Sequence, residues 1–162
     1  MQKQNATMVV AKPAAVCLLI VDDNAQFGAS LVALLQRSGF AADTVRNGGR
    51  ALAYLSRQHV DILLTDIFMP NGDGLELLCE LYRRRILLRV VAMTGGEDTG
   101  MPDMLQVATL MGAECTIRKP FEPAHLLKLI RGMLDAMPAG NAAWPSGPES
   151  TRPKPGPFTN QA

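Results

Sequence analysis

Five polar side chains of this sequence each stand at or just after the end of a short apolar run. They are Asp22, Asp23, Asp66, Thr94 and Lys119. Short apolar runs followed by turn residues are typical of strands that are buried on both faces of a parallel sheet. Because parallel strands present their carboxyl ends at one edge, where ligands bind, we expect these five side chains to converge there.

These residue types point to phosphoryl transfer. Three carboxylates within about 4 Å of one another would repel by roughly 4 kcal/mol per pair at an effective dielectric constant of 20, so a cation is expected among Asp22, Asp23 and Asp66. Hard oxygen ligands with room for water favour Mg²⁺. Asp66 could then act as a nucleophile that accepts a phosphoryl group, while Thr94 and Lys119 hold the transferred oxygens. The GxxxxGK[ST] nucleotide motif is absent from the sequence, so the donor would be another phosphorylated molecule.

The elements that must position these residues alternate along the chain. Apolar runs predict strands at 16–21, 41–46, 61–65, 87–93 and 115–117. Apolar residues at helical spacing predict helices between them and after them, at 27–38, 48–57, 75–85, 101–112 and 121–134. Strict alternation of strand and helix predicts an α/β fold, a doubly wound five-stranded parallel sheet with helices on both faces.

Composition limits the class of protein and its partners. A chain of 162 residues that is 48% hydrophobic can form one domain with a substantial core. The net charge of +1 gives no general attraction to nucleic acid or to a membrane, so we expect neither as a direct partner. Cys17, Cys79 and Cys115 have no CxxC spacing, which predicts free core cysteines rather than disulfides or a zinc site.

The ends of the chain differ from its middle. Residues 1–14 show no clear periodicity and predict a flexible leader, whereas 137–162 are rich in proline and glycine and predict a disordered tail. The folded domain is therefore expected at 15–136. Because no apolar run reaches about 18 residues and no signal peptide is recognisable, we expect a cytoplasmic protein.

The chain resembles the receiver domain of two-component response regulators over about residues 15–136. The motifs that carry the resemblance are Val21-Asp22-Asp23-Asn24, Asp66-Ile67-Phe68-Met69-Pro70, Asp73-Gly74, Thr94-Gly95 and Lys119-Pro120-Phe121, in this order. The resemblance implies a flavodoxin-like (βα)5 fold and a single-domain signalling switch of the chemotaxis type. Such a switch would accept phosphoryl groups but would not be an enzyme with a separate substrate.

The resemblance also assigns roles within the site. Asp66 would be the phosphoacceptor, charged by a phosphohistidine on a sensor histidine kinase or a histidine phosphotransfer protein. Asp23 and Asp66 would bind Mg²⁺ directly together with the backbone carbonyl of Phe68, and Asp22 would act mainly through water. Lys119 would pair with the phosphoryl group.

The same resemblance describes how the switch would move, and the sequence departs from it at three positions. Thr94 would swing toward the phosphoryl group, and Pro120 would follow a cis peptide bond. Thr116 stands where the family usually has an aromatic residue that rotates on activation. Phe68 and Gly96 occupy the positions that influence hydrolysis of the acyl phosphate. Neither can orient a water molecule through its side chain, so we expect slow self-dephosphorylation.

Other functions remain open from the sequence. A haloacid-dehalogenase-like phosphatase also uses a nucleophilic aspartate, a threonine, a lysine and Mg²⁺, but it needs a second carboxylate where this chain has Phe68. A phosphorelay intermediate and a non-phosphorylated pseudo-receiver that only binds a partner are further alternatives. The downstream target would be an unidentified protein, and the last helices could form a homodimer.

Overall fold

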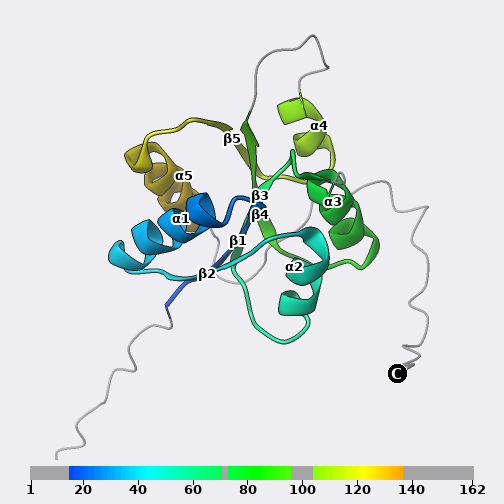
Figure 1. Ribbon diagram of the computed structural model, residues 1–162, viewed down its shortest axis with the longest axis horizontal. Coiled ribbons are helices and arrows are strands. Elements are labelled where there is room, and N and C mark those ends of the chain that lie inside the picture. Colours follow the sequence, from blue (N-terminus) through cyan, green and yellow to red (C-terminus); the bar gives the residue numbers. More distant parts are fainter. Residues whose placement is uncertain (1–14, 71–72, 96–103, 137–162) are drawn as a thin grey trace, which may run out of the picture.

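The computed structural model describes residues 15–70, 73–95 and 104–136, which form ten elements in strict alternation (Figure 1). The strands are β1 (Cys17–Val21), β2 (Ala41–Val45), β3 (Ile62–Asp66), β4 (Arg89–Gly95) and β5 (Cys115–Lys119). The helices are α1 (Ala25–Arg37), α2 (Gly48–Leu55), α3 (Asp73–Arg83), α4 (Met104–Leu110) and α5 (Pro123–Asp135).

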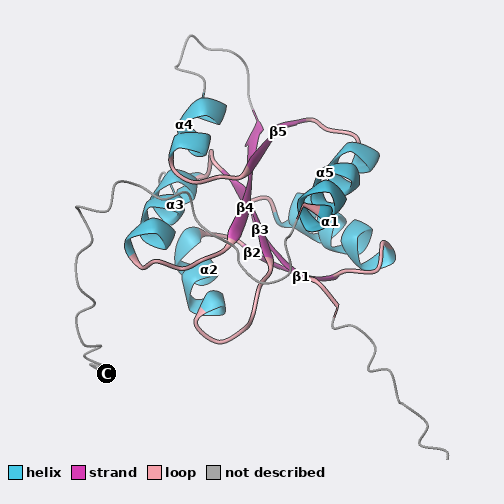
Figure 2. Ribbon diagram, turned by 180° about the vertical axis from the view of Figure 1, so that it is seen from behind, coloured by secondary structure: helices cyan, strands magenta, loops and turns pink. Residues whose placement is uncertain are grey.

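The five strands form one sheet in the order β2-β1-β3-β4-β5, and every neighbouring pair is parallel. Helices α1 and α5 cover one face, whereas α2, α3 and α4 cover the other (Figure 2). The chain therefore has the predicted doubly wound α/β fold. The winding direction reverses between β1 and β3, and ligands bind at the carboxyl edge beside such a reversal.

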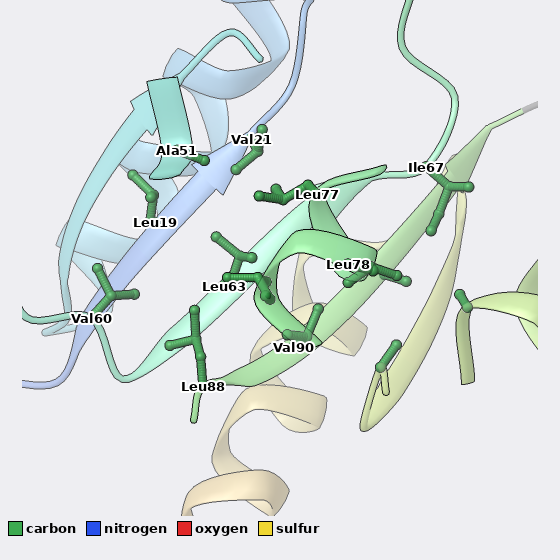
Figure 3. Close-up of a cluster of buried hydrophobic side chains, with 14 of the residues drawn as sticks. Leu19, Val21, Ala51, Val60, Leu63, Ile67, Leu77, Leu78, Leu88 and Val90 are labelled. Carbon is green, nitrogen blue, oxygen red and sulfur yellow. The ribbon is translucent and has the colours of Figure 1, made fainter. Parts of the chain in front are cut away.

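Alternation along the strands divides the core into two layers. Leu19 and Leu63 pack against α2 and α3 on one face, as Figure 3 shows for that cluster, whereas Ile20 and Leu64 pack against α1 and α5 on the other. All four side chains are fully buried. Because a slip of one residue would exchange the two faces, burial on both sides fixes the register that brings the strand ends level.

The ends of the helices follow from local sequence. Asn24 caps α1, because its side-chain oxygen accepts hydrogen bonds from the backbone amides of Gln26 and Phe27. After α1 and α4 the chain turns through Gly39 and Gly112, whose φ angles are 93° and 101°. Only glycine adopts this left-handed conformation readily, which explains where both helices end.

Several boundaries and burial predictions were wrong in detail. The strand expected at 87–93 is Arg89–Gly95, and Leu87 is 63% exposed ahead of it. Tyr82, near the end of the helix predicted at 75–85 from its apolar residues, is 57% exposed. The three cysteines are free as predicted but only half-buried, so they border the core and do not form it.

Some predictions fall outside the described residues. These are the leader at 1–14, the tail at 137–162 and the helix start at Met101-Pro102-Asp103. The limits of the domain at 15 and 136 therefore remain a prediction. Among the helices of the described ranges, none combines the length and the hydropathy that crossing a membrane requires.

Candidate functional site

Three carboxylates meet at the carboxyl edge of the sheet. Asp22 and Asp23 directly follow β1, and Asp66 is the last residue of β3. Carboxylate oxygens from the three residues lie within 4.8 Å of one another. Asp22 is 1% exposed and Asp66 is 7% exposed, whereas Asp23 faces solvent. The three carboxylates among the five predicted side chains therefore converge as expected.

The two buried carboxylates are held in the same way. One oxygen of Asp22 accepts a hydrogen bond from the backbone amide of Asn24 at 2.9 Å, and one oxygen of Asp66 accepts from the amide of Phe68 at 2.9 Å. In each case the donor lies two residues further along the chain, in the turn that leaves the strand. The turns therefore fix the orientation of both carboxylates.

Lys119 bridges these carboxylates from the end of β5. Its Nζ donates to the second oxygen of Asp22 at 2.6 Å and to the second oxygen of Asp66 at 2.6 Å. The lysine side chain is 18% exposed. The Lys119–Pro120 peptide bond is cis, as the resemblance implied. Charge-assisted hydrogen bonds of this kind are the stronger ones, and both are shielded from solvent here.

An aromatic side chain covers another side of the same ammonium group. Lys119 Nζ lies 4.4 Å from the centroid of the Phe27 ring. The Phe121 ring packs against Phe27 edge to face, with the two centroids 6.0 Å apart. The sequence predicted Phe27 only as the first residue of the helix at 27–38, so this contact was missed. The available clue was an aromatic residue in the first turn of the helix that follows the two aspartates.

Close backbone packing brings α3 to the acceptor strand. A Cβ atom added at Gly74 would lie 2.6 Å from the Cα of Ile67 and closer still to the backbone oxygen of Asp66. Real Cβ atoms do not approach backbone atoms so closely, so only glycine fits. Gly74 therefore lets the first turn of α3 rest directly on the chain that leaves β3.

Thr94 and Phe68 lie on chain segments next to Asp66. Thr94 is buried near the end of β4, one residue beyond Met93, which pairs with Asp66 across the sheet. Phe68 lies in the turn after β3, where its side chain is 47% exposed. The structure thus brings Asp22, Asp66 and Lys119 into direct contact and sets Asp23 beside them. It positions Thr94 on the neighbouring strand.

Thr116, which stands where the family usually has an aromatic residue, is half-buried on β5. It lines a shallow depression of about 410 Å³ together with Gln106, Thr109 and Leu110 of α4. Leu110 is largely exposed at its rim. This surface therefore lies between α4 and β5 and is separate from the carboxylate cluster.

The site carries an excess of negative charge. The cluster contains three carboxylates and one lysine, which binds two of them, so two negative charges lack a counter-charge within the cluster. Carboxylate oxygens gathered in this way are hard ligands suited to a small divalent cation. The arrangement can therefore hold a metal ion next to a buried nucleophilic carboxylate and an ammonium group.

Comparison with known proteins agrees with this site. Residues 18–131 match the response regulator receiver domain family, which is more than half of the chain. The chain belongs to this family. Its members are signalling domains that interact with histidine kinases or phosphotransfer proteins, and they are not enzymes with a separate substrate.

Individual relatives give the extent of the likeness. The DNA-binding transcriptional regulator NtrC of Salmonella typhimurium is 34% identical over 111 residues, which cover 68% of this chain and 23% of NtrC. Protein PetR of Rhodobacter capsulatus is 33% identical over 129 residues, which cover 79% of this chain and 52% of PetR. The chain thus spans about half the length or less of these curated relatives.

Solved receiver structures match along almost their whole length. A CheY-like receiver domain protein from Methanospirillum hungatei has a TM-score of 0.67 at 27% identity, covering 75% of this chain and 95% of that one. The chemotaxis response regulator CheY4 of Vibrio cholerae has a TM-score of 0.64 at 25% identity, covering 73% and 98%. The chain is a receiver domain of two-component response regulators. The haloacid-dehalogenase-like alternative gains no support.

Proposed function

We propose that this chain is a phosphorylation-dependent switch that accepts a phosphoryl group from a phosphohistidine onto Asp66. The observation that carries the proposal is the position of Lys119 Nζ, 2.6 Å from Asp22 and 2.6 Å from Asp66 inside a cluster of three carboxylates. A divalent cation would balance the remaining charge and allow an anionic phosphoryl group to approach the carboxylate.

Mg²⁺ is the cofactor that we propose for the cluster. Asp23 and Asp66 would bind it directly together with the backbone carbonyl of Phe68, and Asp22 would act through water. Exposure of Asp23 lets a hydrated ion approach, which suits Mg²⁺ because it gives up its water reluctantly. When bound, the ion would neutralise charge on the phosphoryl oxygens during transfer.

The transfer itself would use residues that the fold has already oriented. The Asp66 carboxylate would attack phosphorus, so that a P–O bond forms while the P–N bond to the donor imidazole breaks and its electron pair stays on nitrogen. The hydrogen bond from the Phe68 amide holds the carboxylate in one orientation for this attack. Lys119 would move its contact from Asp66 to a phosphoryl oxygen, and the Thr94 hydroxyl would donate to another.

The phosphorylated state would be long-lived. Phe68 is apolar and exposed beside the acceptor, so its side chain cannot orient an attacking water molecule. Gly96, the other position expected to matter, lies outside the described residues. We expect slow loss of the phosphoryl group in the presence of Mg²⁺, followed by intact mass after removal of the donor. A lifetime of only seconds would contradict this expectation.

The partners and the setting of the switch are part of the same proposal. The donor would be a sensor histidine kinase or a histidine phosphotransfer protein, and the output would pass to an unidentified protein, with a homodimer as one route. Moving the switch from about 1% to about 99% active requires that phosphorylation stabilise the active state over the inactive one by about 5.5 kcal/mol.

Residues 15–136 would form the receiver. The three unpaired cysteines support a cytoplasmic location.

The proposal is tested with a small-molecule phosphoryl donor. Wild type incubated with acetyl phosphate and Mg²⁺ should gain the mass of one phosphoryl group, and chelation of Mg²⁺ should prevent the gain. Asp66→Ala should gain nothing. Asp43→Ala, which removes an exposed aspartate of the neighbouring strand β2, should behave as wild type. No gain in wild type, or an equal gain in Asp66→Ala, would refute the proposal.

A further inference from the structure

We propose that Phe27 is a positioning residue that holds Lys119 between Asp22 and Asp66. Two sides of the ammonium group face carboxylates at 2.6 Å, and the Phe27 ring covers another, with its centroid 4.4 Å from Nζ. The inference rests on the proposed function of this site, because the lysine must be in place when the phosphoryl group arrives.

The donor geometry of lysine explains why the ring matters. An ammonium group has three N–H donors, and two of them are used by the carboxylates. The face of an aromatic ring carries partial negative charge and attracts a cation within about 6 Å. An aliphatic side chain could fill the same space, but it would offer no such attraction. The aromatic ring of Phe27 therefore attracts the Lys119 ammonium group in a way that an aliphatic side chain would not.

A closed series of contacts fixes the ring itself. Asp22 accepts from the backbone amide of Asn24 at 2.9 Å, and the Asn24 side chain accepts from the backbone amide of Phe27 at 3.1 Å. The Phe27 ring covers Lys119, and Lys119 returns to Asp22. The cap that starts α1 thus ties the ring to the same carboxylate that binds the lysine.

A second ring, two residues beyond Lys119 in the chain, supports the first. Phe121 follows Pro120 and packs edge to face on Phe27, with an angle of 72° between the ring planes. Edge-to-face pairs resist rotation because they place the positive edge of one ring against the negative face of the other. Phe27 is therefore held by its backbone and by a neighbouring ring. Lys119 gains a fixed position before any phosphoryl group binds, and such preorganisation accelerates transfer.

Substitutions at Phe27 separate this role from packing. Phe27→Leu keeps an apolar side chain but removes the ring, and it should slow phosphoryl uptake from acetyl phosphate by about three- to tenfold. Phe27→Tyr keeps the ring and should restore the rate to within about twofold of wild type. Phe40→Leu makes the same chemical change in the same core layer, beyond the opposite end of α1, and should leave the rate unchanged.

A spectroscopic measurement tests the contact without phosphorylation. Because Lys119 Nζ lies over the Phe27 ring, the methylene protons next to it should show an upfield ring-current shift in NMR spectra of lysine-labelled protein. The shift should persist in Phe27→Tyr and Phe40→Leu and disappear in Phe27→Leu. Absence of the shift in wild type would overturn the contact.

The two measurements distinguish the two proposals. If wild type takes up no phosphoryl group, the proposed function fails, and the shift still decides whether Phe27 holds Lys119. If wild type is phosphorylated and Phe27→Leu reacts equally fast, the positioning role is overturned. Acetyl phosphate reacts without a kinase. If Phe27 acted only in the docking of a protein donor, the rate with acetyl phosphate would be the same in Phe27→Leu and wild type, and this result would count against the proposal.

Discussion

The two edges of the sheet both carry charged side chains, but like charges gather at only one of them. At the amino edge, Arg89 pairs with Glu114 and also donates to the backbone oxygen of Met133. Asp61 accepts from the backbone amide of Cys17 at 2.8 Å and contacts His59 at 2.9 Å. Each of these groups is matched by an opposite charge or a backbone partner.

At the carboxyl edge the arrangement is different. Asp22 and Asp66 share Lys119 and are almost completely buried, and Asp23 lies beside them in the same cluster. Gathering like charges in a buried place lowers stability. At the amino edge, Arg89 instead links β4 to Glu114, just ahead of β5, and to α5 through the Met133 oxygen, and the hydrogen bond to Glu114 raises the pKa of the Arg89 guanidinium. The amino edge, where each charged group has a partner, therefore stabilises the fold. The carboxyl edge, where like charges gather, retains the capacity to bind a cation.

The largest difference between the edges should appear when each cation is removed. Lys119→Met leaves Asp22 and Asp66 buried without their shared partner, so the free energy of unfolding without metal should fall by about 3 kcal/mol. Mg²⁺ should restore part of the loss, while phosphoryl uptake should fall by at least about a hundredfold. Urea unfolding with and without Mg²⁺ and intact mass measure these effects.

Arg89→Met is the matched change at the amino edge. It should lower the free energy of unfolding by about 1.5 kcal/mol, because it removes charge-assisted hydrogen bonds to Glu114 and Met133. Mg²⁺ should not restore this loss, and phosphoryl uptake should stay at the wild-type rate. Rescue of Arg89→Met by Mg²⁺, or equal phosphorylation of both variants, would contradict the division of roles.

Two glycine substitutions compare packing near the carboxylate cluster with packing in α5. Gly74→Ala would force a Cβ atom against the backbone of Asp66 and Ile67, and backbone atoms cannot yield as a flexible side chain can. We expect a loss of about 2 to 3 kcal/mol in thermal or urea unfolding. Gly132 lies in α5 with no atom within 4 Å of an added Cβ, so Gly132→Ala should stabilise by about 0.5 to 1 kcal/mol. Equal effects would mean that α3 does not rest on the acceptor strand.

The sequence predicted most of the fold because buried parallel strands leave a strong pattern. Apolar runs located all five strands, and their alternation with helices specified the sheet and the edge at which Asp22 and Asp66 meet. The pattern did not locate the start of β4, since Leu87 is apolar but exposed. An apolar side chain costs little at a surface, so composition alone cannot mark where a strand begins.

The details of the site depend on tertiary contacts that no local pattern contains. Lys119 and Phe27 are far apart in the sequence, and their contact arises because α1 begins and β5 ends at the carboxyl edge. The same holds for Gly74: only glycine fits there, because the backbone of Asp66 and Ile67 lies against it. The residue types of the site could thus be predicted, but the contacts that orient them could not.

A smaller effect should distinguish the edges by their response to metal. Asp23→Asn removes one repelling charge, so without metal it should stabilise the fold by about 0.5 kcal/mol, a modest value because Asp23 is exposed. At about ten times its Kd, Mg²⁺ should stabilise wild type by about 1.4 kcal/mol, and Asp23→Asn should lose most of this response at the same concentration. Asp61→Asn, at the amino edge, should keep it. Thermal unfolding across a Mg²⁺ titration measures both, and an intact response in Asp23→Asn would exclude Asp23 as a ligand.

The smallest effect concerns a carboxylate away from the cluster, Asp43 on β2. The Tyr54 hydroxyl donates to it at 2.5 Å, and this hydrogen bond, with some help from burial, raises the pKa of Tyr54 from 10.0 to about 12. Because the folded pKa lies above the unfolded one, the stabilisation is fully present below pH 10 and is lost as the pH rises through about 12. Tyr54→Phe should therefore be less stable than wild type by about 0.5 kcal/mol below pH 10, and the difference should vanish above about pH 12. Urea unfolding across this range, with tyrosinate absorbance as a check on the midpoint, measures it. If the difference in the free energy of unfolding stayed constant at every pH, the Tyr54 hydroxyl would contribute through packing and not through its hydrogen bond to Asp43.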